Sequence, residues 1–151
     1  MNTCMQCIIS IPELVYYFYK KEYQKDLKSK KGNYACESFK SFIDTYSQSS
    51  RSERADSDLY SVCHSFLQPN RQHDCQEFLR RFFGKIQDEI NGNTKYSFPD
   101  KVTYDKAWEI YKESNFSIID NLFAGLMRSS VRCHKCKYRS GTIVILMIRY
   151  F

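Results

Sequence analysis

Two cysteines in the C-terminal part of the sequence, Cys133 and Cys136, have the spacing Cys-x-x-Cys. Thiolates at this spacing are common zinc ligands, but a structural zinc site needs four ligands and two thiolates alone hold the metal poorly. His134 lies inside the same turn and is expected to be exposed rather than bound to a metal. We therefore interpret Cys133 and Cys136 as an incomplete metal pair and expect no cofactor in this chain.

A second group of polar residues, Gln72, His73, Asp74 and Glu77, stands directly before an apolar run. The Asp74 carboxylate can accept hydrogen bonds from backbone amides as a helix N-cap, and Glu77 three residues later completes a pattern like a capping box. Packing does not require the other polar residues at these positions. They are candidates for binding, although the simpler alternative is that Asp74 only caps a helix and Gln72 is a surface residue.

The other five cysteines lie among apolar or helical-looking residues, at Cys4, Cys7, Cys36, Cys63 and Cys75. The N-terminus does not read as a secretory signal, so these thiols are expected to be reduced and mainly to serve packing. The longest apolar stretch, 143–148, is far shorter than the roughly 20 residues that a membrane helix needs. A cytoplasmic or nuclear protein without a membrane partner is expected.

Apolar residues recur at helical spacing in two N-terminal segments and predict two amphipathic helices. The first follows Pro12, which suits a first helical turn, and the second spans 34–46. Their apolar positions are Leu14, Tyr17, Phe18 and Tyr19 in the first and Phe39, Phe42, Ile43 and Tyr46 in the second. A basic linker is expected around 20–33 and a loop over 47–58, where small and charged residues break the pattern.

The clearest predicted helix begins near Asp74, with an apolar face of Phe78, Leu79, Phe82, Phe83, Ile86 and Ile90. A shorter amphipathic segment covers 107–111. Residues 131–139 are typical of a cysteine turn between two strands, and 143–151 is apolar and rich in β-branched residues. Helices followed by strands predict an α+β domain.

Four blocks, in this order along the chain, resemble the ubiquitin-specific protease family of cysteine peptidases. The blocks are residues 1–18, residues 72–79 with the family's Gln-Gln-Asp box and His73 at its second position, residues 107–136, and residues 144–151. The resemblance implies the papain-like fold of that family, truncated and internally deleted. Residues 1–121 then correspond to the helical thumb, 122–142 to part of the fingers and 143–151 to a strand of the palm, with residues skipped between Thr142 and Ile143.

Two registers compete at the N-terminus of this alignment. Placing Asn2-Thr3-Cys4 on the family's Asn-Thr-Cys makes Cys4 the nucleophile but requires deleted residues before Gln6 and Cys7. Placing Met1-Asn2-Thr3 on the family's Met-Asn-Ser needs no gap as far as residue 18, and we favour it. The nucleophile is then expected upstream of Met1 and the histidine base downstream of Phe151, so this chain holds no catalytic residue.

The resemblance also implies a function. The intact family hydrolyses the isopeptide bond after the C-terminal glycine of ubiquitin, using a cysteine nucleophile and a histidine base. Because this chain lacks both, we expect it to be inactive alone. The Gln-Gln-Asp box of the family lies beside the cleft for the C-terminal tail of ubiquitin, which assigns tail recognition to Gln72 and Asp74. The expected partners are ubiquitin and ubiquitinated proteins.

Two other functions remain open. The chain can be a noncatalytic ubiquitin-binding module or pseudoenzyme, or a basic nucleic-acid-binding protein. A net charge of +6 is compatible with the last, because clustered Lys and Arg neutralise phosphates. The basic excess is concentrated at 20–31 without any nucleic-acid-binding motif, however, so no nucleic-acid partner is expected.

Overall fold

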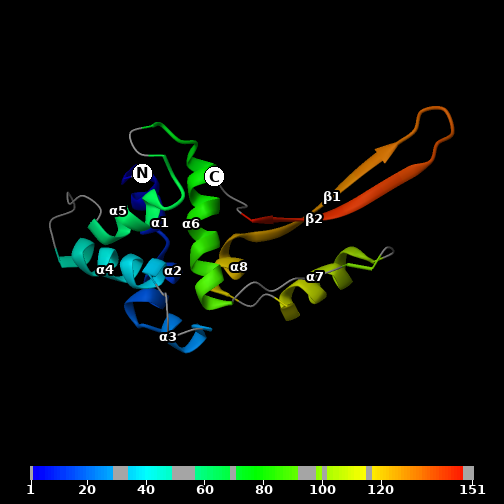
Figure 1. Cartoon of the computed structure of the whole chain (residues 1–151). Coiled ribbons are helices and arrows are strands. Elements are labelled where there is room, and N and C mark those ends of the chain that lie inside the picture. The colour runs from blue at the N-terminus through cyan, green and yellow to red at the C-terminus, as the bar shows by residue number, and fades with distance from the viewer. Residues whose placement is uncertain are drawn as a thin grey trace. The chain divides into compact units, whose positions relative to one another are not determined.

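The computed structural model describes residues 2–28, 34–48, 57–68, 71–91, 98–99, 102–114 and 117–147. The chain divides into two compact units (Figure 1). Met1–Asn93 together with Ser117–Ile119 form the helical unit, and Thr94–Phe116 together with Asp120–Phe151 form the hairpin unit. No helix in the described ranges is long and apolar enough to cross a bilayer.

The helical unit contains α1 (Asn2–Ile8), α2 (Pro12–Tyr19), α3 (Tyr23–Asp26), α4 (Tyr34–Gln48), α5 (Ser57–His64) and α6 (Cys75–Ile90). Helix α2 starts at Pro12 as predicted, because its first amide needs no partner within the helix. Leu14, Tyr17 and Phe18 are buried. The prediction for Tyr19 is wrong: its side chain is 55% exposed, since the helix ends there and the ring meets the ammonium groups of basic residues instead.

Helix α6 matches its prediction. Asp74 is the N-cap, and its Oδ1 accepts a hydrogen bond of 3.0 Å from the backbone N–H of Glu77. The six predicted apolar positions, from Phe78 to Ile90, are all buried. The Glu77 carboxylate pairs with Arg81 one turn later, at 2.6 Å, rather than returning to the N-cap as a full capping box requires.

Aromatic rings connect the helices of this unit. Phe18 of α2 meets Phe39 of α4 edge-to-face with centroids 4.9 Å apart, and Phe39 meets Phe82 of α6 in the same way at 5.4 Å. Phe78 stacks on Phe82 at 5.9 Å, and Tyr23 of α3 stacks on Phe18 at 5.1 Å. These geometries are the ones that aromatic quadrupoles favour. The core of the helical unit is therefore a continuous row of rings across four helices.

The loop and linker predictions need correction. Helix α4 continues to Gln48 and α5 begins at Ser57, so both ends of the loop predicted over 47–58 are helical, while its middle lies outside the described residues. The predicted basic linker contains the short helix α3, where Tyr23 is fully buried. The contact between Tyr23 and Phe18 stabilises this short helix. The neighbouring Lys and Glu residues in the sequence do not predict this contact.

The N-terminus of α4 is held by a residue from another helix. The backbone N–H groups of Ala35 and Cys36 donate to the two carboxylate oxygens of Glu89, each at 2.8 Å. The first turn of a helix leaves such amides without intrahelical partners. Glu89 of α6 therefore acts as a cap for α4 from a distance and joins the two helices.

The described part of the hairpin unit contains α7 (Tyr104–Ser114), most of α8 (Ile118–Phe123), β1 (Ala124–Arg132) and β2 (Arg139–Met147). Helix α7 is longer than the predicted segment at 107–111 and buries Ala107 and Tyr111. The buried Tyr111 hydroxyl donates to the Asp120 carboxylate, and the Tyr104 hydroxyl donates to the Leu126 carbonyl oxygen at 3.0 Å. These bonds join α7 to α8 and β1.

Strands β1 and β2 form an antiparallel hairpin whose register runs from Ala124 opposite Met147 to Arg132 opposite Arg139. The predicted cysteine turn is confirmed, and the helices and two-stranded sheet of the described residues agree with the α+β class. Strand β2 begins at Arg139, earlier than predicted, and runs without a break through Thr142 and Ile143. Residues 148–151 lie outside the described residues.

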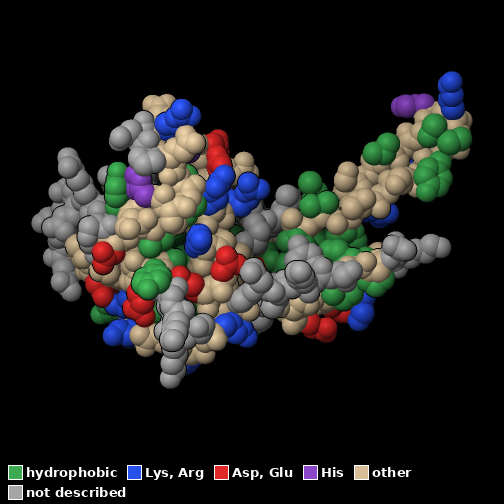
Figure 2. All heavy atoms as spheres, in the orientation of Figure 1, with side chains coloured by type: hydrophobic (Ala, Val, Ile, Leu, Met, Phe, Trp, Pro, Cys, Tyr) green, Lys and Arg blue, Asp and Glu red, His purple; other side chains and the backbone are tan. Residues whose placement is uncertain are grey.

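The hairpin carries a basic charge that the sequence analysis placed elsewhere. Residues 124–147 contain no Asp or Glu, and their basic side chains are Arg128, Arg132, Lys135, Lys137 and Arg139. On the face of the β1–β2 hairpin that is toward the viewer, Figure 2 shows blue basic side chains and no red acidic ones. Arg132 and Arg139 stand directly opposite each other, a pairing of like charges that destabilises a hairpin.

Candidate functional site

A cavity of about 410 Å³ lies at the N-terminal end of α6, where the polar group singled out in the sequence is found. Residues from α1, from α5, from the connection after α5 and from α6 form its wall. These residues are Cys4, Tyr60, His64, Leu67, Gln68, Arg71, Gln72, His73, Cys75 and Phe78. All of them belong to the helical unit.

Side-chain hydrogen bonds fix the chain segment that leads into α6. The Gln68 carbonyl oxygen accepts a hydrogen bond of 2.9 Å from Nε2 of His73. The Arg81 guanidinium donates to the Phe66 carbonyl oxygen at 3.1 Å while it pairs with Glu77. A loop held at both ends in this way keeps its polar side chains in place and is a suitable frame for a binding site.

Gln72 and Asp74, the two predicted binding residues, are both exposed beside this frame. Gln72 lines the cavity, whereas Asp74 lies two residues further on, at the start of α6, and is not part of the wall. One Asp74 oxygen accepts a hydrogen bond from the Glu77 N–H, so Asp74 does cap the helix, as the simpler interpretation predicts. An exposed carboxylate can still receive a cationic ligand on its other oxygen.

Cys4 lies in α1, and its sulfur is 2.9 Å from the sulfur of Cys75, the first residue of α6. Burial and the hydrogen bond with Cys75 raise the pKa of the Cys4 thiol to about 11. A cysteine nucleophile needs the opposite, because only the thiolate attacks a carbonyl group. The surroundings of Cys4 therefore do not activate it.

Cys133 and Cys136 lie in the exposed turn between β1 and β2. The Cys133 carbonyl oxygen accepts a bond from Lys137 N–H, and Cys133 N–H donates to the Tyr138 carbonyl oxygen, so the turn is closed by backbone bonds. Hydrogen bonds from Cys136, and then from the backbone of Lys135, lower the pKa of the Cys133 thiol. Within the described residues, no three His, Cys, Asp or Glu side chains are grouped in a way that could hold a metal ion.

The opposite pKa shifts of Cys4 and Cys133 predict a difference in reactivity. At neutral pH, iodoacetamide should alkylate Cys133 at least about tenfold faster than Cys4, because one pKa unit changes the thiolate fraction tenfold. The rate at Cys4 should rise steeply as the pH approaches 11. Mass spectrometry of tryptic peptides measures both rates, and the difference should vanish in urea. Equal rates in native buffer would contradict the described surroundings.

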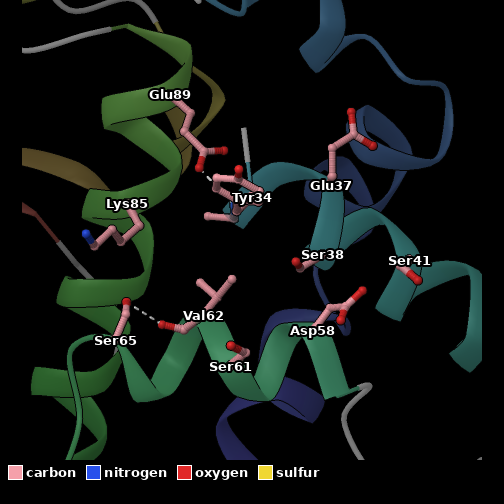
Figure 3. Close-up of a pocket in the computed structure, with 11 residues that line it drawn as sticks. Tyr34, Glu37, Ser38, Ser41, Asp58, Ser61, Val62, Ser65, Lys85 and Glu89 are labelled. Atoms are coloured by element: carbon pink, nitrogen blue, oxygen red, sulfur yellow. Dashed lines mark hydrogen bonds between the residues drawn. The ribbon is translucent and has the colours of Figure 1, made fainter. Parts of the chain in front are cut away.

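A larger cavity, of about 780 Å³, lies between α4, α5 and α6 (Figure 3). Its polar residues include Glu37, Asp58, Lys85 and Glu89, and Figure 3 shows them coming from three different helices. The Glu89 carboxylate already holds the N-terminus of α4, so this residue has a structural role. Its lining contains no cysteine or histidine, and we place the candidate site at the smaller cavity.

Several residues that line the smaller cavity, among them Tyr60 and His64, are not singled out by the sequence analysis. The sequence predicts a mainly packing role for Cys75 and Cys7, but both side chains are exposed. His64 of α5 also lines the cavity, and its ring lies against that of Tyr60 in a tilted arrangement with centroids 3.9 Å apart. Their spacing of one helical turn, four residues, was the only local signal for that contact.

Comparison with known proteins places these features in a family. The family model described as ubiquitin carboxyl-terminal hydrolase matches residues 1–146. The chain is 28% identical to ubiquitin carboxyl-terminal hydrolase 15 of Homo sapiens over 172 positions, which cover 94% of the chain and 16% of the relative. It is 23% identical to ubiquitin carboxyl-terminal hydrolase 12 of Saccharomyces cerevisiae over 171 positions, covering 94% of the chain and 14% of that protein.

The chain thus spans only about a sixth of the length of these relatives. Both alignments are longer than the chain itself, so the relatives contain residues inside the matched region that this chain lacks. The match nevertheless covers both units. The chain belongs to the ubiquitin carboxyl-terminal hydrolase family.

Proposed function

We propose that this chain is a ubiquitin-recognition part of the family's peptidase domain, and that the N-terminal end of α6 receives the extended C-terminal tail of ubiquitin. The observation that carries this proposal is the exposure of Gln72 and Asp74 beside a cavity, at the positions that match the family's Gln-Gln-Asp box. The tail of ubiquitin carries arginine side chains, and an exposed carboxylate is a suitable partner for a guanidinium group.

The electrostatics of the start of α6 make Asp74 the central residue of this proposal. Its Oδ1 is fixed by the Glu77 N–H, which orients the carboxylate. Its second oxygen has no partner among the described residues and can accept a bond from a ligand. Gln72 adds an amide that can both donate to and accept from an extended backbone. Together they provide charge and backbone recognition at one edge of the cavity.

We further propose that ubiquitin-dependent hydrolysis belongs to the intact family and is absent from these 151 residues alone. The raised pKa of Cys4 supports this, because Cys4 is the residue that the alternative register would make the nucleophile. A ubiquitin carrying a thiol-reactive group at its C-terminus tests the assignment. We expect no covalent product with this chain, and a product at Cys4 would show that the gapped register is right.

Ubiquitin binding tests the proposed site directly. Asp74→Asn should weaken the affinity of the chain for ubiquitin by about tenfold, because a charge-assisted hydrogen bond is worth roughly 1.5–3 kcal/mol and asparagine remains a good N-cap. Gln72→Ala should weaken it less. Titration of isotope-labelled ubiquitin, followed by NMR, gives the affinity and shows whether the C-terminal tail residues shift.

The matched control is Asp88→Asn, which removes the same charge from an exposed position near the other end of α6 and should leave the affinity unchanged. Ubiquitin without its C-terminal tail should bind to the parent chain at least as weakly as full-length ubiquitin binds to the Asp74→Asn variant. Equal binding of tailed and tailless ubiquitin would rule out the proposed site. A smaller loss for Asp74→Asn than for Asp88→Asn would do the same.

A further inference from the structure

Two thiols that are far apart in the sequence meet at the wall of the candidate cavity. The sulfurs of Cys4 and Cys75 are 2.9 Å apart, although 71 positions separate the residues. Cys75 is exposed and Cys4 partly exposed, whereas Cys36 and Cys63 are buried in the core of the same unit. The pair is therefore within reach of a small dissolved oxidant.

Packing alone does not account for this contact. A buried free cysteine behaves as a small apolar residue, and Cys36 and Cys63 fit that description. An exposed cysteine at the first position of α6 buries little apolar area, so a packing role explains Cys75 poorly. The shared hydrogen bond shows instead that the two thiols are oriented toward each other. The raised pKa of Cys4 agrees with this orientation, since Cys4 stays protonated beside its partner.

We propose that Cys4 and Cys75 are a redox-modification site, at which a peroxide converts the two thiols into a disulfide that joins α1 to the start of α6. The more exposed Cys75 attacks the peroxide as thiolate, its sulfur takes an oxygen atom to form a sulfenic acid, and the O–O bond breaks. The Cys4 sulfur then attacks the sulfenic sulfur and forms the S–S bond, while its thiol proton passes to the departing hydroxide, which leaves as water. Two thiols and one hydrogen peroxide give one disulfide and two waters, and a thiol reductant reverses the change.

The structural adjustment that the bond requires is small. A disulfide has an S–S length of about 2.05 Å, so the sulfurs now at 2.9 Å must approach by roughly 0.9 Å. The bond would close a long loop between two helices and restrict the cavity wall. Cys75 is next to Asp74, so the cross-link would form directly at the edge of the candidate site. Formation of this disulfide does not require ubiquitin binding.

The test is a disulfide map of the full 151-residue chain after brief treatment with hydrogen peroxide. Trypsin separates a peptide of residues 1–20, with Cys4 and Cys7, from a peptide of residues 72–80, with Cys75. We expect these two peptides to be linked, with a mass two hydrogens below their sum, and dithiothreitol to separate them. Two thiols held in contact react with a high effective concentration, so this link should form at least about tenfold faster than any other.

Substitution distinguishes the two cysteines of the first peptide. Cys7→Ser removes an exposed thiol one turn along α1 and should leave the link intact, while Cys4→Ser and Cys75→Ser should each abolish it. In urea, the preference for Cys4 with Cys75 should disappear. Retention of the link in Cys4→Ser, a faster link from Cys75 to a cysteine outside α1, or equal rates in native buffer and in urea would each overturn the proposal.

Discussion

Replacing Phe82 with alanine is expected to lower the free energy of unfolding of the helical unit by about 3–5 kcal/mol. The Phe82 side chain is fully buried and touches the rings of Phe39, Phe78 and Phe83, at centroid distances of 5.4, 5.9 and 6.0 Å. Alanine leaves a cavity in the middle of the row of aromatic rings and removes the contact between Phe39 of α4 and Phe82 of α6. Because a domain of this size has about 5–15 kcal/mol of stability, the loss is a large share of the total.

Urea unfolding of the full chain, followed by far-UV circular dichroism, measures this change. Phe82→Leu keeps most of the volume and should cost less than about 1.5 kcal/mol, which separates the effect of the cavity from that of the ring. Arg80→Ala, at an exposed position two residues earlier on α6, should stay within about 0.5 kcal/mol of the parent. A loss below about 1 kcal/mol for Phe82→Ala would show that the ring row is not the centre of the core.

The second large effect is expected at Glu89, whose carboxylate accepts the amide protons of Ala35 and Cys36. Glu89→Ala removes both acceptors and a negative charge from the N-terminus of α4, and should cost about 2 kcal/mol. Glu89→Gln should cost less, because its carbonyl oxygen can keep one bond. The same urea titration measures both variants.

Asp88→Asn is the control for Glu89 as well, since it neutralises the neighbouring acidic residue, which is exposed. It should leave the free energy of unfolding nearly unchanged. If Glu89→Ala were no more destabilising than Asp88→Asn, the two short bonds to α4 would contribute nothing net to stability. Removal of the Glu89 charge should also lower the pKa of Cys36, which Glu89 raises in addition to the larger effect of burial.

The sequence predicted helix α6 well because its determinants are local. The cap at Asp74 and the apolar face from Phe78 to Ile90 follow from hydrogen bonds three residues apart and from the helical period, which any window of the chain reveals. The same locality accounts for the start of α2 at Pro12 and for the turn around Cys133. In each case the residues that decide the structure are within one or two turns of each other.

Features that depend on distant contacts could not be predicted in this way. Tyr23 is buried because a ring of another helix covers it, although its neighbours in the sequence are charged. Tyr19 has the right spacing for the core of α2 but is exposed, because its ring lies at the end of the helix beside the ammonium groups of Lys20 and Lys40. At the candidate site, the local sequence pattern indicated Gln72 and Asp74. Cys75 became a candidate only through its contact with Cys4, which is 71 positions away in the sequence.

The carboxylate of Glu89 also has a consequence for the order in which the chain folds. The acceptor for the first amides of α4 lies 54 and 53 residues further along the chain, so that helix cannot complete its N-terminal turn with native bonds until α6 has formed and docked. Helix α6, with its own cap at Asp74, depends on no such distant acceptor at its N-terminus. Assembly is therefore expected to begin at the later helix, with the earlier one completed against it.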